Sequence, residues 1–419
     1  YLPGRSRSSH ADLARSGAAR RDHLPFTCSR YGSPVSNAPS GQIREVAALF
    51  LRLGLVAFGG PPAHIAMMRE EVVRRKGWVD DERFVDLVGA TNLIPGPNST
   101  ELAIHLGFER GRWRGLVTAG VCFILPAALL VTALAWAYVT YGQTPAFTAV
   151  LYGVVPVTIA IIVHALFGLR KAVFNRPSLV VIALASFAAY LASVNELVIL
   201  AAGAFGALFF SWAKKLGEKA RNTNRVNGIS VGLLAAGSPL FTDPTAAQLG
   251  QLFITMAKIG AVLYGSGYVL LAFLEADFVD RLGWITEQQL LDAISIGQVT
   301  PGPVFTTATF VGYLVAGLPG AFVATVAIFA PAFLFVALLT KVATFLRSRE
   351  WTAVILDGLN AASIALMAAV TWRLGLISLI DPLTITIAVT ALAILALTRL
   401  NSAWLILAGA VAGSLHGLV

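Results

Sequence analysis

Two Pro-Gly-Pro triplets interrupt apolar sequence, and each should break a helix because proline removes a backbone donor and glycine weakens the helix further. A helix that restarts after such a break exposes unpaired N–H groups and the positive end of its dipole, and both attract anions. The predicted helix breaks are Pro95, Gly96, Pro97, Pro301, Gly302 and Pro303. Side chains suited to capping a new helix follow them: Asn98, Ser99 and Thr100 in the first copy, Thr306 and Thr307 in the second.

A second kind of break occurs once in each half of the chain, in FGGPPAH (Phe58 to His64) and YGSGYV (Tyr264 to Val269). Non-helical backbone at membrane depth persists only inside protein or beside a watery cavity, because unpaired backbone groups in lipid are costly. We therefore expect all four breaks to converge on one anion site. The alternative is that glycine and proline only permit close helix packing. The substrate-binding residues predicted in this second pair are Gly59, Gly60, His64, Gly265 and Tyr268.

One cation lies inside an apolar run in each half, Arg52 in LFLRLGLVAFGG and Lys258 in FITMAKIGAVLYG. A cation at the centre of a membrane helix costs at least about 2.5 kcal/mol, so such a residue is a candidate for function. The alternative is that each side chain reaches a membrane interface, since both lie in the first half of their segments. A cation in both halves nevertheless suggests that the pair balances the charge of a bound anion.

Four residues are candidates for proton coupling. Glu101 follows the first triplet, where it could carry a proton that changes anion affinity or could only cap the helix. Asp86 and Asp292 occupy equivalent places before the two triplets, and pairing with a neighbouring cation is their expected use. His105, like His64, could join a proton path, although a lone histidine is more often a hydrogen-bonding core residue.

The elements that carry these residues belong to a membrane protein. The chain has 419 residues, of which 57% are hydrophobic and only 13% charged, and many of its apolar runs are long enough to cross a bilayer. The net charge of +9 arises from Lys and Arg in short segments between apolar runs, which is the topology signal of membrane proteins, so we expect no nucleic-acid partner. The lipid bilayer is the expected partner.

The sequence favours neither a metal site nor a cofactor. Cys28 and Cys122 form no metal-binding or disulfide pattern, and no dinucleotide fingerprint occurs, which argues against a reductase. No nucleotide-binding loop is present either, so any uphill transport must draw on an ion gradient. We expect a transport protein and not an enzyme.

The chain contains the same unit twice. A shift of 206 positions places Gly54 on Gly260, Gly77-Trp78 on Gly283-Trp284, the first triplet on the second, and Gly111 on Gly317. Such agreement indicates an internal duplication. We expect a mobile basic tail (1–44), a first transmembrane repeat (45–213), a linker (214–247) and a second transmembrane repeat (248–419).

Charge in equivalent loops indicates that the second repeat is inverted. Residues 69–83 carry five Lys or Arg, whereas their counterpart, residues 275–289, keeps only Arg281 beside several acids. The first loop should therefore be cytoplasmic and the second external, as in many secondary transporters. We predict an all-α polytopic membrane protein with two inverted-topology repeats, about ten transmembrane helices and two re-entrant Pro-Gly-Pro helical hairpins.

This count places the N-terminal tail outside, although the tail holds seven arginines. Either the tail is an exception to a statistical rule, which we prefer, or residues 45–68 form a second hairpin and residues 229–247 an extra crossing.

The motifs LRLGLVAFGGPPAHIAMMREEVVRRKGWVDDERFVDLVGATNLIPGPNSTELAIHLGFERG and LYGSGYVLLAFLEADFVDRLGWITEQQLLDAISIGQVTPGPVFTTATFVGYLVAG resemble the long-chain, two-domain chromate transporter family. The resemblance covers about residues 45–419. It implies a multi-pass protein of the cytoplasmic (inner) membrane that exports chromate, driven by the membrane potential or a proton gradient, and so confers chromate resistance. Sulfate is the implied competitor.

The family motif residues carry over position by position, as Arg52, Gly59, Gly60, Pro61, His64, Pro95, Gly96, Pro97, Asn98, Ser99, Thr100 and Glu101, then Lys258, Gly265, Gly267, Tyr268, Pro301, Gly302, Pro303, Thr306 and Thr307. The residues alone indicate an anion site but do not choose between chromate and sulfate. A sulfate transporter and a passive oxyanion channel remain alternatives, and a homodimer stays open.

Overall fold

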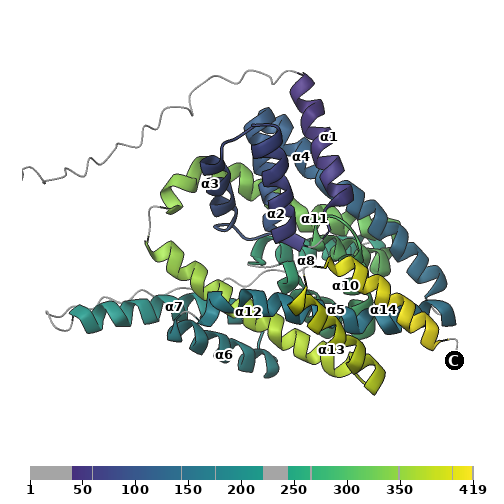
Figure 1. The fold of residues 1–419 in the computed structure, drawn as a ribbon. Coiled ribbons are helices and arrows are strands. Elements are labelled where there is room, and N and C mark those ends of the chain that lie inside the picture. The colour runs from purple at the N-terminus through teal and green to yellow at the C-terminus, as the bar shows by residue number, and fades with distance from the viewer. Residues whose placement is uncertain are drawn as a thin grey trace, which may run out of the picture. The chain divides into compact units, whose positions relative to one another are not determined.

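The computed structural model describes residues 40–58, 60–142, 144–174, 176–219, 244–264, 267–347, 350–398 and 400–417, and their regular elements are all helical. The elements are α1 (Ser40–Val56), α2 (Gly60–Arg69), η1 (Glu70–Arg75), α3 (Asp81–Thr91), α4 (Asn98–Tyr141), α5 (Pro145–Phe174), α6 (Pro177–Leu191), α7 (Glu196–Lys219), α8 (Pro244–Val262), η2 (Gly267–Val269), α9 (Leu270–Leu274), η3 (Glu275–Arg281), α10 (Glu287–Val299), η4 (Val304–Thr306), α11 (Thr307–Arg347), α12 (Glu350–Ser378), α13 (Pro382–Leu397) and α14 (Ser402–His416) (Figure 1).

Several of these helices are long and apolar enough to cross a bilayer. In the described part of the chain there are five such stretches: Asn98–Tyr141, Pro145–Phe174, Glu196–Ala213, Val304–Leu338 and Trp351–Ser378. The helices α6, α13 and α14 are apolar but shorter. Because an apolar stretch of about 20 residues spans the hydrocarbon core, the chain is a multi-pass membrane protein.

One helix of each repeat packs against two helices of the other repeat, and the two sets of contacts are equivalent. Helix α5 packs on α13 and α14, and its counterpart α12 packs on α6 and α7. Glycine pairs allow the backbones to approach at both crossings: Gly153 faces Gly409, and Gly358 faces Gly203. The two repeats are therefore interlocked about a pseudo-two-fold axis.

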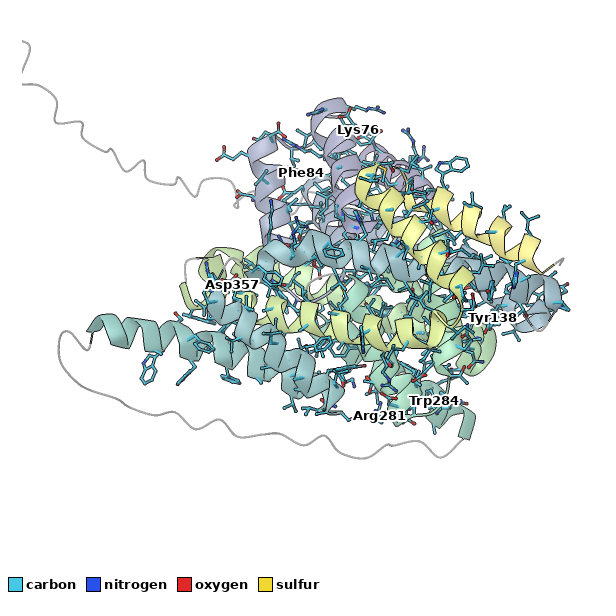
Figure 2. All side chains as sticks on the ribbon, turned by 60° about the horizontal axis from the view of Figure 1, so that its bottom comes forward. Lys76, Phe84, Tyr138, Arg281, Trp284 and Asp357 are labelled. Atoms are coloured by element: carbon cyan, nitrogen blue, oxygen red, sulfur yellow. The ribbon has the colours of Figure 1, made fainter. Side chains whose placement is uncertain are left out.

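Local backbone features recur in both repeats. The segments η1 and η3 are both π-helical, and each is followed, two residues after its end, by a glycine with positive φ, +58° at Gly77 and +62° at Gly283. The next helices begin at equivalent N-caps, Asp80 for α3 and Thr286 for α10, whose side chains accept backbone N–H groups. Figure 2 shows Lys76 of the first loop at the top of the view and Trp284 of the second loop at the bottom.

The predicted match of Gly111 with Gly317 is wrong by one residue. Helices α4 and α11 are both kinked, and the residue with positive φ is Arg112 (+53°) in the first and Gly317 (+60°) in the second. Equivalent residues of the two repeats are therefore 206 positions apart at the triplets and 205 positions apart at the kinks. The second copy starts with the 3₁₀ turn η4, which rises further per residue than an α-helix and so covers the same path with fewer residues.

The chain turns back between α1 and α2, so the start of α1 and the residues that follow α2 lie close together. Glu45 near the start of α1 accepts hydrogen bonds from Lys76 (3.1 Å) and Arg110 (2.8 Å). These bonds, chiefly that from Arg110, hold the pKa of Glu45 below its ordinary value. The start of α1, the end of α2 and α3 lie toward the same end of the fold, at the top of Figure 1. The geometry agrees with the alternative in which residues 45–68 form a hairpin; most of the proposed extra crossing, residues 229–243, lies outside the described residues.

Candidate functional site

The two Pro-Gly-Pro turns each meet the helix break of the opposite repeat. The N–H of Gly96 donates to the carbonyl of Leu263 at 2.8 Å, and the N–H of Gly302 donates to the carbonyl of Ala57 at 2.8 Å. Ala57 and Leu263 are equivalent residues, just beyond the ends of α1 and α8. Both glycines have positive φ, +133° and +95°, which a residue with a side chain adopts only under strain. The four predicted breaks therefore meet in two reciprocal pairs.

Further bonds hold these breaks in place. The ring nitrogen Nε2 of His64 lies 3.0 Å from the carbonyl oxygen of Ala57. The same oxygen accepts the N–H of Gly302 in the second triplet, so His64 and Gly302 share one acceptor. The hydroxyl of Tyr264 donates to the carbonyl of Asn92 at the end of α3. Helix ends carry carbonyl groups without partners inside the helix, and these contacts satisfy two of them within the protein.

A cavity of about 880 Å³ opens beside the first triplet. Its walls come from the break before α2, the turn between α3 and α4, the C-terminal half of α5, the first half of α12, and the loop between α13 and α14. The first residue of α4, Asn98, lines it, so the N-terminus of the part of α4 that precedes the kink at Gly111 and Arg112 faces the cavity. The side chain of Asn98 donates to the Oδ1 of Asn92 at 3.0 Å, which orients both amides.

The polar groups of this cavity are almost all neutral. They are Asn92, Asn98, His164, Tyr264, Asn360, Ser363, Asn401 and Ser402. The hydroxyl of Ser363 is buried and has no hydrogen-bond partner among the described residues. Amides, hydroxyls and a helix N-terminus supply hydrogen bonds and a positive potential without a fixed cation. Such a lining suits a small anion that donates few or no hydrogen bonds itself.

Arg52 and Lys258 do not line the cavity and are paired with acids instead. Arg52 lies 3.5 Å from Glu71, and its side chain is 64% exposed. Lys258 lies 2.5 Å from Asp277, which is the residue equivalent to Glu71. Each acid also pairs with an arginine one turn later, Arg75 at 2.8 Å and Arg281 at 2.9 Å respectively. The two cations thus neutralise acids of the π-helical segments, which differs from the expected balance of substrate charge.

The hydroxyls after the second triplet bond to their own helix. Thr306 donates to the carbonyl of Pro303 at 2.8 Å, and Thr307 donates to that of Val304 at 2.9 Å. Val304, which stands in the place of Asn98, is buried. In the first copy Ser99 and Thr100 are buried, and the Thr100 hydroxyl has no partner among the described residues. The first triplet opens onto the cavity, and the second is enclosed by protein.

The four proton-coupling candidates lie in different surroundings. Asp292 is buried and accepts hydrogen bonds from Tyr138 (2.8 Å) and Gln288 (3.0 Å). Asp86 is on the exposed face of α3, and His105 is buried within α4. Glu101 is fully buried, one turn into α4.

Of the other predicted residues, Gly60 lines the cavity, whereas Gly59, Gly265 and the side chain of Tyr268 lie outside the described part of the structure. Sequence reasoning missed Asn92, His164, Asn360, Ser363, Asn401 and Ser402. Their signal is a polar residue inside an otherwise apolar run, as in ILDGLNAAS around Asn360, but this signal alone does not show that the residues meet.

A second, charged cavity of about 610 Å³ lies beside the opposite end of α12. Arg373 there pairs with Glu275 (3.1 Å), Asp280 (3.2 Å) and Glu287 (2.8 Å). These short distances show that the charges of this cavity are largely satisfied within the protein.

Comparison with known proteins gives the family. A family model described as "Chromate transporter" matches residues 44–208 and again residues 250–414. The two matches begin and end 206 residues apart, which confirms the internal duplication.

Three curated relatives carry related names. The chromate transport protein of Cupriavidus metallidurans is 34% identical over 92% of this chain and 95% of its own length. A probable chromate transport protein of Synechococcus elongatus is 35% identical, over 71% of this chain and 75% of its own length. The chromate transport protein of Pseudomonas aeruginosa is 32% identical, over 88% of this chain and 91% of its own length. No solved structure matches this chain.

Proposed function

Because this chain belongs to the chromate transporter family, and is a multi-pass membrane transport protein and not an enzyme, we propose that it exports chromate from the cytoplasm. The proposed location is the inner (cytoplasmic) membrane, the driving force is the membrane potential or a proton gradient, and the outcome is chromate resistance. The observation that carries the proposal is the cavity at the N-terminus of α4, lined by neutral hydrogen-bond donors.

The oxyanion binds at the first Pro-Gly-Pro turn. The first N–H groups of α4 have no partner inside the helix, and the dipole adds about half a positive charge at this end. The amides of Asn98 and Asn360 and the hydroxyl of Ser363 lie on the surrounding walls. A fully ionised tetrahedral oxyanion accepts hydrogen bonds on every oxygen, so a ring of donors matches it. Sulfate has the same shape and charge and is expected to compete.

The cavity faces the cytoplasm in this proposal. Gly168 and Ala172 line it near the end of α5, beside the exposed cations Arg170, Lys171 and Arg176. Lys and Arg are enriched in cytoplasmic loops. Arg176 also pairs with Asp357 of α12 at 2.5 Å, on the same side as the α12 residues of the cavity. An exporter must collect its substrate there.

The four broken units are re-entrant hairpins in this arrangement. The unit α1–α2, and α3 with the first part of α4, enter from the cytoplasm and return, and their counterparts enter from the opposite side. The remaining parts of α4 and α11, with α5, α6, α7, α12, α13 and α14, cross the membrane. This proposal gives eight crossings among the described helices in place of about ten, four in each repeat. Because four is an even number, inverted repeats also require the extra crossing that the alternative places at residues 229–247, most of which lie outside the described residues.

The test is uptake of radiolabelled chromate into inverted membrane vesicles, before and after a protonophore, with unlabelled sulfate as competitor. The proposal expects uptake that saturates, collapses when the gradient is dissipated, and is inhibited by sulfate. Flux that persists without a gradient and does not saturate would instead indicate a passive oxyanion channel. Sulfate flux without chromate flux would indicate a sulfate transporter.

Two serines of α12 offer a matched pair for the site. Ser363 lines the cavity with an unpartnered hydroxyl, whereas Ser378 donates to the carbonyl of Leu374 at 2.7 Å. Ser363→Ala should raise the KM for chromate by roughly tenfold to a hundredfold, the worth of one hydrogen bond to a charged ligand. Ser378→Ala should leave the KM unchanged. Equal KM values for the two variants would remove Ser363 from the site.

A further inference from the structure

The carboxyl group of Glu101 is buried without any group to balance a charge. The residue is 0% exposed, and neither carboxyl oxygen has a hydrogen-bond partner in the described residues. No ion pair joins it to a described cation, in contrast to Asp277, which is held by two cations. An unpaired carboxylate in a protein interior is very costly, whereas a protonated carboxyl is far less so. The arrangement therefore favours the neutral acid.

This carboxyl lies directly under the turn that forms the anion site. Its Oε1 packs against Gly96, where a Cβ on that glycine would overlap it. The N–H of Gly96 donates to the carbonyl of Leu263, and the hydroxyl of the next residue, Tyr264, donates to the carbonyl of Asn92. A change of charge at Glu101 thus acts on the wall of the cavity and on both contacts to the second repeat.

Other titratable groups on the neighbouring elements must be considered. They are His105 on α4 itself, His64 on α2, Asp86 on α3 and Tyr264 beyond α8; α11 contributes Ala332 near Gly96. His64 already bonds to the carbonyl of Ala57, and Tyr264 to that of Asn92. Glu101 is the acid of this group that is both buried and without a hydrogen bond in the described chain.

We propose that Glu101 is the proton-binding residue of the oxyanion site, and that the anion binds only while this carboxyl is neutral. The inference rests on the proposed function and deepens it. Glu101 follows Asn98 by three residues, about 4.5 Å along the helix axis. An ionised carboxylate within the first turn of the helix repels a dianion at its N-terminus and cancels the positive end of the helix dipole.

The proposal fixes the sign of the coupling. A proton on Glu101 and the dianion occupy the protein together, so their joint exit moves net negative charge out of the cell. A membrane potential that is negative inside drives this movement, at about 2.3 kcal/mol per charge per 100 mV. A proton gradient that is acidic outside opposes it. Proton exchange against chromate would need the opposite arrangement, in which proton and anion exclude each other.

Sulfate binding to the purified full-length protein tests the inference, because sulfate stays a dianion between mildly acidic and mildly alkaline pH while chromate does not. The affinity of the wild-type protein for sulfate should fall by at least about tenfold as the pH is raised by two units, because binding requires one proton on the protein. Glu101→Gln, which is permanently neutral, should bind about equally at both pH values. Asp292→Asn alters a buried acid of the other repeat and should keep the wild-type pH dependence.

A second measurement uses only the wild-type protein and so does not depend on how Glu101→Gln folds. In weakly buffered alkaline solution, sulfate binding should withdraw protons from the medium. Absence of proton uptake together with a pH-independent affinity overturns the inference, as does an unchanged pH dependence in Glu101→Gln. Failure of the proposed function is a separate result: neither chromate nor sulfate binds the wild-type protein at any pH.

Discussion

Gly302 offers the sharpest test of the crossing between the two repeats. Its φ of +95° disfavours any side chain, and a Cβ there would lie 2.8 Å from the Cβ of Ala127 and 3.4 Å from the carbonyl oxygen of Gly54. Its N–H also donates to Ala57 at 2.8 Å. Gly302→Ala therefore adds backbone strain of about 1–2 kcal/mol to a packing penalty of about 1–3 kcal/mol.

The chain provides a control at Gly317. Its φ is +60°, but no atom lies within 4 Å of a Cβ built there, and the equivalent residue of the first repeat is Arg112, with φ +53°. The first repeat thus already tolerates a side chain at this backbone position. Gly317→Ala should cost only about 1 kcal/mol of strain.

The assay is the thermal unfolding midpoint of each purified variant in the same detergent, followed by chromate uptake in proteoliposomes. Gly302→Ala should lower the midpoint by roughly 2–6 °C, corresponding to about 2–5 kcal/mol, and Gly317→Ala by about 1 °C. Uptake should fall with Gly302→Ala even at temperatures where the variant is folded. Equal midpoints for the two variants would refute the close reciprocal contact at the second triplet.

Two further predictions concern charged contacts outside the cavity. Lys258→Met removes one of two cations from the buried Asp277 and should destabilise the protein by about 1–3 kcal/mol, whereas Arg52→Met, at the exposed equivalent, should cost less than about 1 kcal/mol in the same thermal assay. Glu45 has a pKa below its ordinary 4.5, chiefly because of its hydrogen bond from Arg110, so its pairing stabilises the fold at neutral pH and is lost as the pH falls through the lowered pKa. Glu45→Gln should therefore lack part of the fall in unfolding midpoint that the wild-type protein shows on acidification below about pH 4.5; an identical profile would contradict this.

The sequence predicts the repeat and the breaks because these depend on residues with few conformational choices. Glycine at positive φ and proline at a helix start recur at one spacing, so the equivalence of Gly77 with Gly283 follows from the chain alone. The offset between the repeats changes by one residue within a helix, between the triplet and the kink, and a change of one residue does not interrupt the hydrophobic pattern of the sequence. Only the backbone angles of Arg112 and Gly317 show it.

The charged residues show what sequence alone could not decide. Arg52 and Lys258 stand out as cations in apolar runs, but their partners are 19 residues further on, at Glu71 and Asp277, across a helix break. The hydropathy of the sequence shows that a charge lies in an apolar segment, but it does not show which distant acid pairs with that charge in the folded protein. Glu45 similarly reaches Lys76 and Arg110, and these contacts join the start of α1 to the end of η1 and to α4 near its kink.

The two halves share a backbone but not a set of ligands, and this difference argues for one anion site near the axis and not for two. Asn92, Asn98 and Tyr264 supply polar groups to the cavity, whereas the residues equivalent to Asn98 and Tyr264 are the apolar Val304 and Phe58. Val304 is buried and apolar, and the hydroxyls of Thr306 and Thr307 bond to their own helix, so the side chains of these three residues offer no donor to an anion. Tyr264, from the second repeat, instead reaches the first turn. The duplication therefore supplies two symmetric pairs of crossed breaks, and the divergence of side chains leaves the polar cavity at only one of the two turns among the described residues.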